Sequence, residues 1–303
     1  MTMLNIQKVS VKIFLCCQMV FYFGCTNVPA PIDSHFNRGV DHYDNKELAK
    51  AIEEYKLALR KNPSDTFALY NLAVVYQDQG KNDRAAEIYQ DVLKQTEDTF
   101  SRINLASIQY LQGKREEAFA QLKTAAKKNP DSAHALSVLG ELQEQEDMFD
   151  EAEKTYLSAL KTDSRHSVSH YRLGRLLIKN KRFDQGTEHI LKAIDMEPEN
   201  PAYLEALGGE FERSGKLLEA ANMLERASVL EPDRFEVHMR LGDIYKKKKM
   251  YQEALTRYWS ALAIRDDESY IHRSILEIYK TLSDLEIEKL KNLEGQSSFA
   301  QTH

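Results

Sequence analysis

Cysteine is almost missing from this 303-residue chain, and the few that occur are confined to one end. Cys16, Cys17 and Cys25 are the only three, and all lie within the first 25 residues. The rest of the chain therefore excludes a disulfide framework and a cysteine-based metal site. Glycine and proline are also scarce, with 12 and 7 residues, which is too few for a loop-rich all-β protein. Helix formers such as Ala, Leu, Glu and Lys dominate instead, so we expect an all-α fold.

The chain also lacks a surplus of positive charge. Its formal net charge is -6, from 41 Lys and Arg against 47 Asp and Glu. A nucleic-acid binder needs basic residues to replace the counterions that condense on phosphates. We therefore expect no nucleic-acid partner.

Signatures of catalysis and metal binding are missing as well. No H-E-x-x-H, G-x-S-x-G, phosphate-binding loop or dinucleotide fingerprint occurs in the sequence. His166 and His170 come closest to a metal pair, but His166 falls at the boundary between two repeats, so the two need not share a helix face. We expect no enzyme activity, no cofactor, no metal and no small-molecule substrate.

The N-terminal segment has a composition of its own. Lys8 and Lys12 precede an uncharged, mostly apolar stretch over residues 13–23, which Gly24 and Cys25 follow. This order is typical of an export signal, and the apolar stretch is shorter than the about 20 residues that span a membrane. A small residue followed by Cys resembles a bacterial lipoprotein signal, which implies lipidation of Cys25. A conventional or uncleaved signal remains the alternative.

These features predict two segments at the start of the chain and a contact with a membrane. Residues 1–24 form the signal segment, residues 25–34 form a tether, and the membrane is contacted through this N-terminal anchor. Pro29 and Pro31 favour an extended tether, which suits a body held away from a membrane surface.

Small residues recur through the rest of the chain at a fixed period. Gly140, Gly174, Gly208 and Gly242 are spaced by 34 residues, and Gly39 has the same phase. A second phase holds Ala51, Ala85, Ala118, Ala152, Gly186, Ala220 and Ala254. A glycine inside a helix costs about 1 kcal/mol relative to alanine, so its repetition needs a packing reason. Missing side chains let two helices cross closely, and the pattern therefore predicts stacked helix pairs.

This pattern resembles the tetratricopeptide repeat. Residues 240–245 (Arg-Leu-Gly-Asp-Ile-Tyr), followed by Ala254, Tyr258 and Ala261, carry nearly the whole signature of that family. The resemblance implies an all-α, right-handed superhelical solenoid of helix-turn-helix repeats over residues 35–268. We expect seven repeats, at 32–65, 66–98, 99–132, 133–166, 167–200, 201–234 and 235–268. A degenerate capping helix pair is expected at 269–294, followed by a frayed tail at 295–303.

The family resemblance also implies that ligands lie in a concave groove lined by the first helix of each repeat. In the N-terminal repeats, the positions expected to face inward are apolar or aromatic: Phe36, Val40, Tyr43, Tyr70, Val74, Ile103 and Tyr110. In the later repeats they are polar and mixed in charge, and include Tyr171, Arg175, Arg213 and Lys246. This division predicts a bipartite groove that binds a peptide or helix through apolar contacts at one end and charges at the other. Alternatively, the apolar residues pack helix against helix or are covered by the N-terminal segment.

Together these observations predict a protein-protein interaction scaffold. We expect it to be exported, anchored in a bacterial cell envelope through Cys25, and to assemble or stabilise a multiprotein complex. A soluble co-chaperone or regulatory adaptor in the cytoplasm is the alternative.

Overall fold

The computed structural model describes residues 34–300, with side chains through residue 292. The signal segment, Cys25 and nearly all of the tether lie outside the described residues. Fifteen α-helices make up the secondary structure of the described part. They are α1 (Ser34–Asp44), α2 (Leu48–Lys61), α3 (Thr66–Asp78), α4 (Asn82–Gln95), α5 (Thr99–Leu111), α6 (Arg115–Lys128), α7 (Ala133–Gln145), α8 (Phe149–Thr162), α9 (Ser167–Lys179), α10 (Phe183–Met196), α11 (Pro201–Arg213), α12 (Leu217–Leu230), α13 (Phe235–Lys247), α14 (Tyr251–Ile264) and α15 (Ser269–Ala300).

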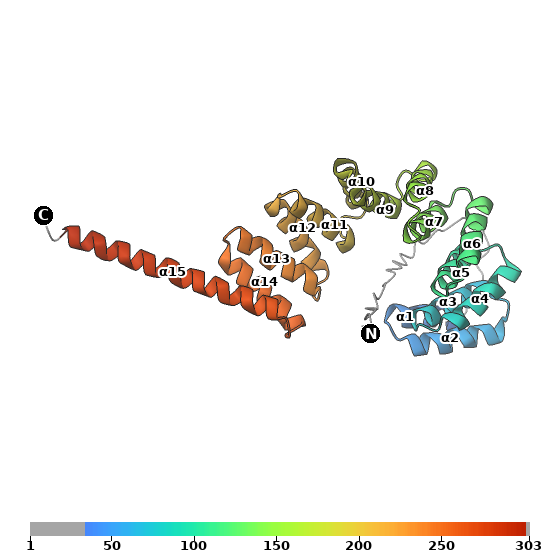
Figure 1. The fold of residues 1–303 in the computed structure, drawn as a ribbon. Coiled ribbons are helices and arrows are strands. Elements are labelled where there is room, and N and C mark those ends of the chain that lie inside the picture. Colours follow the sequence, from blue (N-terminus) through green and yellow to red (C-terminus); the bar gives the residue numbers. More distant parts are fainter. Residues whose placement is uncertain (1–33, 301–303) are drawn as a thin grey trace, which may run out of the picture.

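Consecutive helices pair, and the pairs stack into a solenoid. We call the odd-numbered helices α1–α13 the A helices and the even-numbered helices α2–α14 the B helices. Each A helix packs on the B helix that follows it, and each B helix packs on the next A helix. Figure 1 shows the pairs arranged along an arch, with α8 and α10 on its outer side and α7 and α9 toward its inner side. The predicted all-α solenoid is confirmed.

Side chains and turn residues set the limits of the helices. The Asp65 carboxylate accepts hydrogen bonds from the amides of Phe67 and Ala68, and Asp98 accepts one from the amide of Ser101. These bonds satisfy amides that have no partner inside a helix. Between the helices of each pair, one residue adopts a positive φ. This residue is Lys46, Gly80, Gly113, Asp147, Lys181, Gly215 or Lys249.

The recurring glycines lie where paired helices cross. A Cβ placed on Gly242 would stand 2.5 Å from the ring of Tyr258, and one on Gly140 would stand 2.6 Å from the ring of Tyr156. Both rings are fully buried. The absent side chain therefore makes room for a large aromatic side chain on the partner helix, which is the packing role that the sequence predicts.

The C-terminal capping pair is not formed. Where the sequence predicts two helices at 269–294, α15 is one continuous helix, and it continues through residues 295–300, where a tail was expected. The eighth repeat has Leu276 at the phase of Gly242, and Glu288 at the phase of Ala254. Two larger side chains at the crossing point prevent a close helix pair, so the second half projects away from the solenoid (Figure 1).

The first half of α15 does cover the end of the array. Ile271, Ile275 and Ile278 are buried in one cluster with Leu255 and Leu262 of α14. Within residues 34–300, no helix has the length and apolar character needed to cross a membrane.

Candidate functional site: a charged groove on the A helices

A groove of about 810 Å³ lies against the A helices of the C-terminal half. It is lined by residues of α7, α9, α11 and α13, with one residue from α10. The lining residues are Glu144, Arg175, Ile178, Lys179, Ile190, Glu205, Ala206, Gly209, Glu212, Arg213, Arg240 and Lys247. Eight of the twelve are charged, so the groove is suited to a polar or charged ligand.

Two of the three acidic residues of the groove are paired with arginines, and the third, Glu144, accepts a hydrogen bond from the Tyr156 hydroxyl at 3.4 Å. Glu212 accepts hydrogen bonds from Arg240 at 3.0 and 3.2 Å, and Glu205 forms an ion pair with Arg234 at 2.9 Å. Burial raises the pKa of Glu205, and the nearby arginines oppose that shift. The charges of Glu205 and Glu212 are therefore largely neutralised by neighbouring arginines.

Several basic residues keep their charge toward the groove. The Arg175 guanidinium lies 5.6 Å from the ring centre of Tyr171, and the Lys179 ammonium lies 4.0 Å from that of Phe149. Stacking on an aromatic ring positions a cation without neutralising it. Together with the exposed Lys247, these side chains give the groove a surplus of positive charge.

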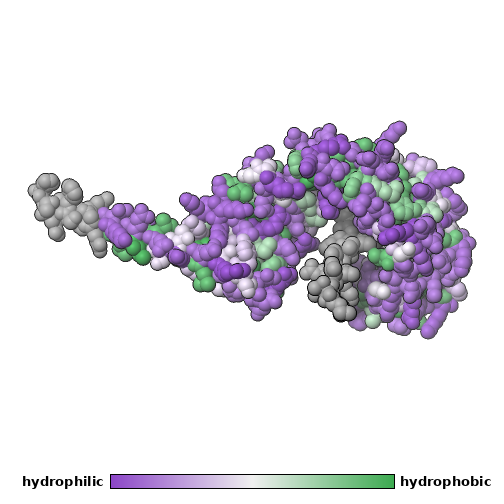
Figure 2. Space-filling model, viewed as in Figure 1, coloured by the Kyte–Doolittle hydropathy of each residue, from purple (hydrophilic) through white to green (hydrophobic). Residues whose placement is uncertain are grey.

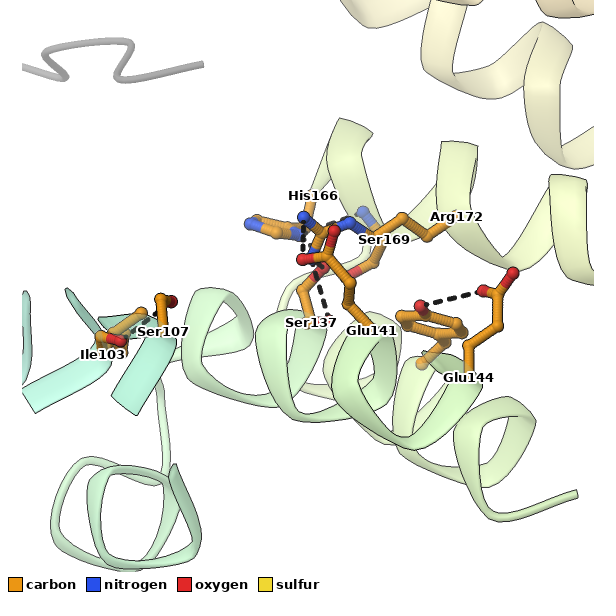
Figure 3. A network of polar contacts seen from close by, with 9 residues as sticks. Ile103, Ser107, Ser137, Glu141, Glu144, His166, Ser169 and Arg172 are labelled. Atoms are coloured by element: carbon orange, nitrogen blue, oxygen red, sulfur yellow. Dashed lines mark hydrogen bonds and ion pairs between the residues drawn. The ribbon is translucent and has the colours of Figure 1, made fainter. Parts of the chain in front are cut away.

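A partly buried polar network joins α7 and α9 where the groove begins (Figure 3). Arg172 of α9 donates hydrogen bonds to the carbonyl of Ser137 at 2.9 Å and to its hydroxyl at 3.2 Å. The same guanidinium forms an ion pair with Glu141 of α7 at 2.6 Å. Charge-assisted bonds in a partly buried site are stronger than surface ion pairs, so Arg172 fixes the spacing of α7 and α9.

Four histidines lie where the helix pair α7–α8 meets the helix pair α9–α10. The ring centres of His134 and His166 are 6.2 Å apart, and the Nδ1 atoms of His170 and His189 are 2.8 Å apart. Burial lowers the pKa of His134 and of His189 to about 4 and also lowers that of His166 and His170. The described residues contain no cluster of three or more potential metal ligands.

The N-terminal A helices expose a different set of side chains on the same face. Phe67 on α3 is 74% exposed, and Phe100 and Leu111 on α5 are also exposed. Phe67 and Phe100 are each the second residue of their helix. Leu111, Lys179 and Arg213 are each the thirteenth residue of theirs. At about 3.6 residues per turn, the second, ninth and thirteenth residues share one helix face. The apolar residues therefore continue the line of the charged groove.

Most of the predicted apolar wall is half-buried. Phe36, Val40, Tyr43, Tyr70 and Val74 pack against the core of the first three repeats, and Tyr110 packs against the next cluster. The Tyr110 hydroxyl also donates a hydrogen bond to Glu146 at 2.6 Å, and burial with this bond raises its pKa to about 12.

Two predicted groove residues have other surroundings. Ile103 is wrong as a groove residue, because only 1% of it is exposed and it packs among Ala106, Leu122 and Val138. Its side chain fills the space between neighbouring helix pairs. Lys246 is half-exposed and forms an ion pair with Glu277 of α15.

Of the other predicted residues, Arg175 and Arg213 line the groove. Tyr171 lies beside it, with its ring 4.7 Å from that of Tyr203. The sequence prediction did not include Phe67 and Phe100, although second helix residues lie on the same face as Arg175 and Arg213.

The repeats match two models of known protein families. Residues 39–203 match the model of the tetratricopeptide repeat protein 21 C-terminal ARM domain, and residues 210–269 match a tetratricopeptide repeat model. No curated protein matches the sequence.

Solved structures show the same fold at low sequence identity. A chain of the APC/C hetero-tetramer Cut9-Hcn1 is similar with a TM-score of 0.64 and 16% identity, over 82% of this chain and 49% of that chain. A tetratricopeptide repeat protein from Parabacteroides merdae has a TM-score of 0.54 and 20% identity, over 81% and 97%. PilF of Pseudomonas aeruginosa has a TM-score of 0.55 and 22% identity, over 65% and 89%. This chain spans about half the length of the matched Cut9-Hcn1 chain.

Proposed function

This chain belongs to the tetratricopeptide-repeat family, and from that premise we propose that it is a non-enzymatic scaffold that binds a protein segment along its A helices. The observation that carries the proposal is the groove of about 810 Å³, in which Glu205 and Glu212 are paired with arginines while Arg175, Lys179 and Lys247 keep their charge toward the groove. Such a surface recognises a ligand that supplies carboxylates. The ligand class that fits is an acidic peptide segment or helix of a protein partner.

The neighbouring aromatic residues extend this proposal toward the N-terminal repeats. Phe67 and Phe100 expose large apolar area on the same helix face as Arg213. A segment that follows the arch would place apolar side chains against these rings and acidic side chains against the basic groove. The bipartite groove thus remains our proposal, with Phe67 and Phe100 in place of the buried Ile103.

Charge reversal tests the groove directly. We expect the double substitution Arg175→Glu and Lys247→Glu to remove the partners that copurify with the tagged chain, because it converts the surplus of positive charge into repulsion. The matched control is Lys154→Glu with Lys161→Glu, which reverses two exposed lysines on the B helix α8. Equal capture of the same partners by both variants would refute the role of the groove.

We further propose that the scaffold is exported and held at a membrane of a bacterial envelope through Cys25. The support is the order of basic residues, apolar stretch, Gly24 and Cys25 in the sequence. We expect the chain to enter the detergent phase on phase separation, and Cys25→Ala to move it to the aqueous phase. A chain that stays aqueous in both forms would favour a soluble adaptor.

A further inference from the structure

The projecting helix α15 carries an apolar stripe that its own solenoid does not cover. Leu276, Tyr279, Ile287 and Leu290 are 67%, 50%, 47% and 53% exposed. With Ser283 they form one helix face, because successive members are three or four residues apart. The buried residues Ile271, Ile275 and Ile278 lie on a different face, which packs on α14. Figure 2 shows hydrophobic residues along this projecting part of the molecule.

The spacing of the stripe is symmetric about Ser283. From Leu276 to Leu290 the steps are three, four, four and three residues. When two such helices lie antiparallel with their Ser283 residues at the two-fold axis, Leu276 of each copy is level with Leu290 of the other. Tyr279 is likewise level with Ile287. A two-fold interface requires this kind of self-complementary surface.

The small residue in the centre and the shape of the chain favour the same arrangement. Ser283 at the axis allows the two helix backbones to approach closely. In the antiparallel arrangement the two solenoids lie at opposite ends of the helix pair, because α15 projects away from α1–α14 (Figure 1).

Charges beside the stripe are also complementary between two antiparallel copies. Lys280, Asp284 and Glu288 lie along one side of the stripe. In an antiparallel pair, this side of one helix faces the same side of the other helix. Lys280 of one copy is then level with position 286 of the other, midway between Asp284 and Glu288. Within the described residues these three side chains form no ion pair, so they are available to a second copy.

We infer that α15 is a dimerisation helix, through which two copies of this chain associate antiparallel about Ser283. A second copy fits better than an unrelated partner, because the apolar spacing and the flanking charges are both complementary to themselves. Dimerisation would hold two A-helix grooves on one assembly, and would let a scaffold engage two partner segments at once.

Cysteine cross-linking tests the register. In the full chain with Cys16→Ser, Cys17→Ser and Cys25→Ser, we expect Ser283→Cys to form a disulfide-linked dimer on mild oxidation. Leu276→Cys alone should not cross-link, whereas a mixture of the Leu276→Cys and Leu290→Cys chains should. Self-cross-linking of Leu276→Cys would indicate a parallel pair and would overturn the inference. Asn292→Cys, an exposed position away from the stripe, is the control for random collision.

Solution mass tests the association itself. Light scattering of the purified chain should give twice the monomer mass of 34.9 kDa. Leu290→Glu should weaken the dimer at least tenfold, and Leu285→Glu, an exposed leucine on the opposite face of α15, should leave it unchanged. Circular dichroism confirms that both variants stay folded. A monomer at all concentrations, or a dimer insensitive to Leu290→Glu, would overturn the inference. Ser283→Cys in a chain that keeps Cys16, Cys17 and Cys25 tests the N-terminal segment as the occupant. An intramolecular disulfide between position 283 and one of these cysteines would also overturn the inference.

Discussion

The glycine at the helix crossing of the seventh repeat offers a direct measure of what holds the repeats together. In Gly242→Ala the new methyl carbon would stand 2.5 Å from the Tyr258 ring. That ring is fully buried, and its hydroxyl donates a hydrogen bond to Asp243 at 2.7 Å, so it has little freedom to move.

Two opposing effects set the magnitude of this substitution. Overpacking a well-packed core costs about 1–3 kcal/mol. Alanine recovers about 1 kcal/mol through its higher helix propensity. With the ring held in place we expect the upper part of the range, and therefore a net loss of about 1–2 kcal/mol of unfolding free energy. For a chain of this size that is a fall of about 2–4 °C in the melting temperature.

Gly209→Ala is the matched control for this experiment. Gly209 is also helical, but the nearest atom to an added Cβ would be a guanidinium nitrogen at the end of the long Arg240 side chain, at 3.3 Å. We expect this variant to be neutral or slightly more stable than the parent chain. Thermal melting followed by circular dichroism compares the two, and an equal response to both substitutions would refute the close-approach explanation of the repeated glycines.

Substitutions at three further positions test other parts of the fold. His134 is held neutral by burial, which lowers its pKa to about 4 from 6.5, so the unfolded chain binds more protons between these values and stability falls as the pH drops. Between pH 7.5 and about pH 5, His134 should lower the unfolding free energy of the parent chain by about 2 kcal/mol, and His134→Phe should lack this decrease. Urea unfolding measures it, and an unchanged pH dependence would contradict this. Arg172→Met should lower stability by about 1–3 kcal/mol and Arg172→Lys by less, because lysine replaces only part of the fork of hydrogen bonds to Ser137 and Glu141; equal stability of all three chains would argue against the network. Asp65→Ala should lower the unfolding free energy by about 0.5–2 kcal/mol through the loss of the α3 cap, with faster amide hydrogen exchange at Phe67 and Ala68; unchanged exchange would count against it.

The features that could be predicted from sequence are those set by local spacing. Gly140 and Gly242 reveal the helix crossings because a repeated glycine in a helix is unfavourable unless the partner helix needs the space. The same reasoning explains why α15 was mispredicted. Ser283 followed by Glu286 is typical of a helix start, yet Leu276 and Glu288 at the two crossing phases leave no site for a second helix to pack.

Site residues were harder to predict, because their exposure depends on neighbouring repeats. Ile103 and Tyr171 occupy the same repeat position, but the first is enclosed between helix pairs and the second lies beside the groove. The lateral spacing of A helices decides between these outcomes, and it depends on contacts such as that of Arg172 with Ser137. A single repeat does not specify that spacing.

The central claim is that partners bind along the A helices, and site-specific photo-cross-linking tests it most directly. A photoreactive amino acid in place of Phe100 or Arg213 probes the A-helix face, and one in place of Val229, a 77% exposed residue of the B helix α12, probes the other side. The account predicts that the same partner cross-links from Phe100 and from Arg213 but not from Val229. Cross-linking from Val229 alone would contradict it.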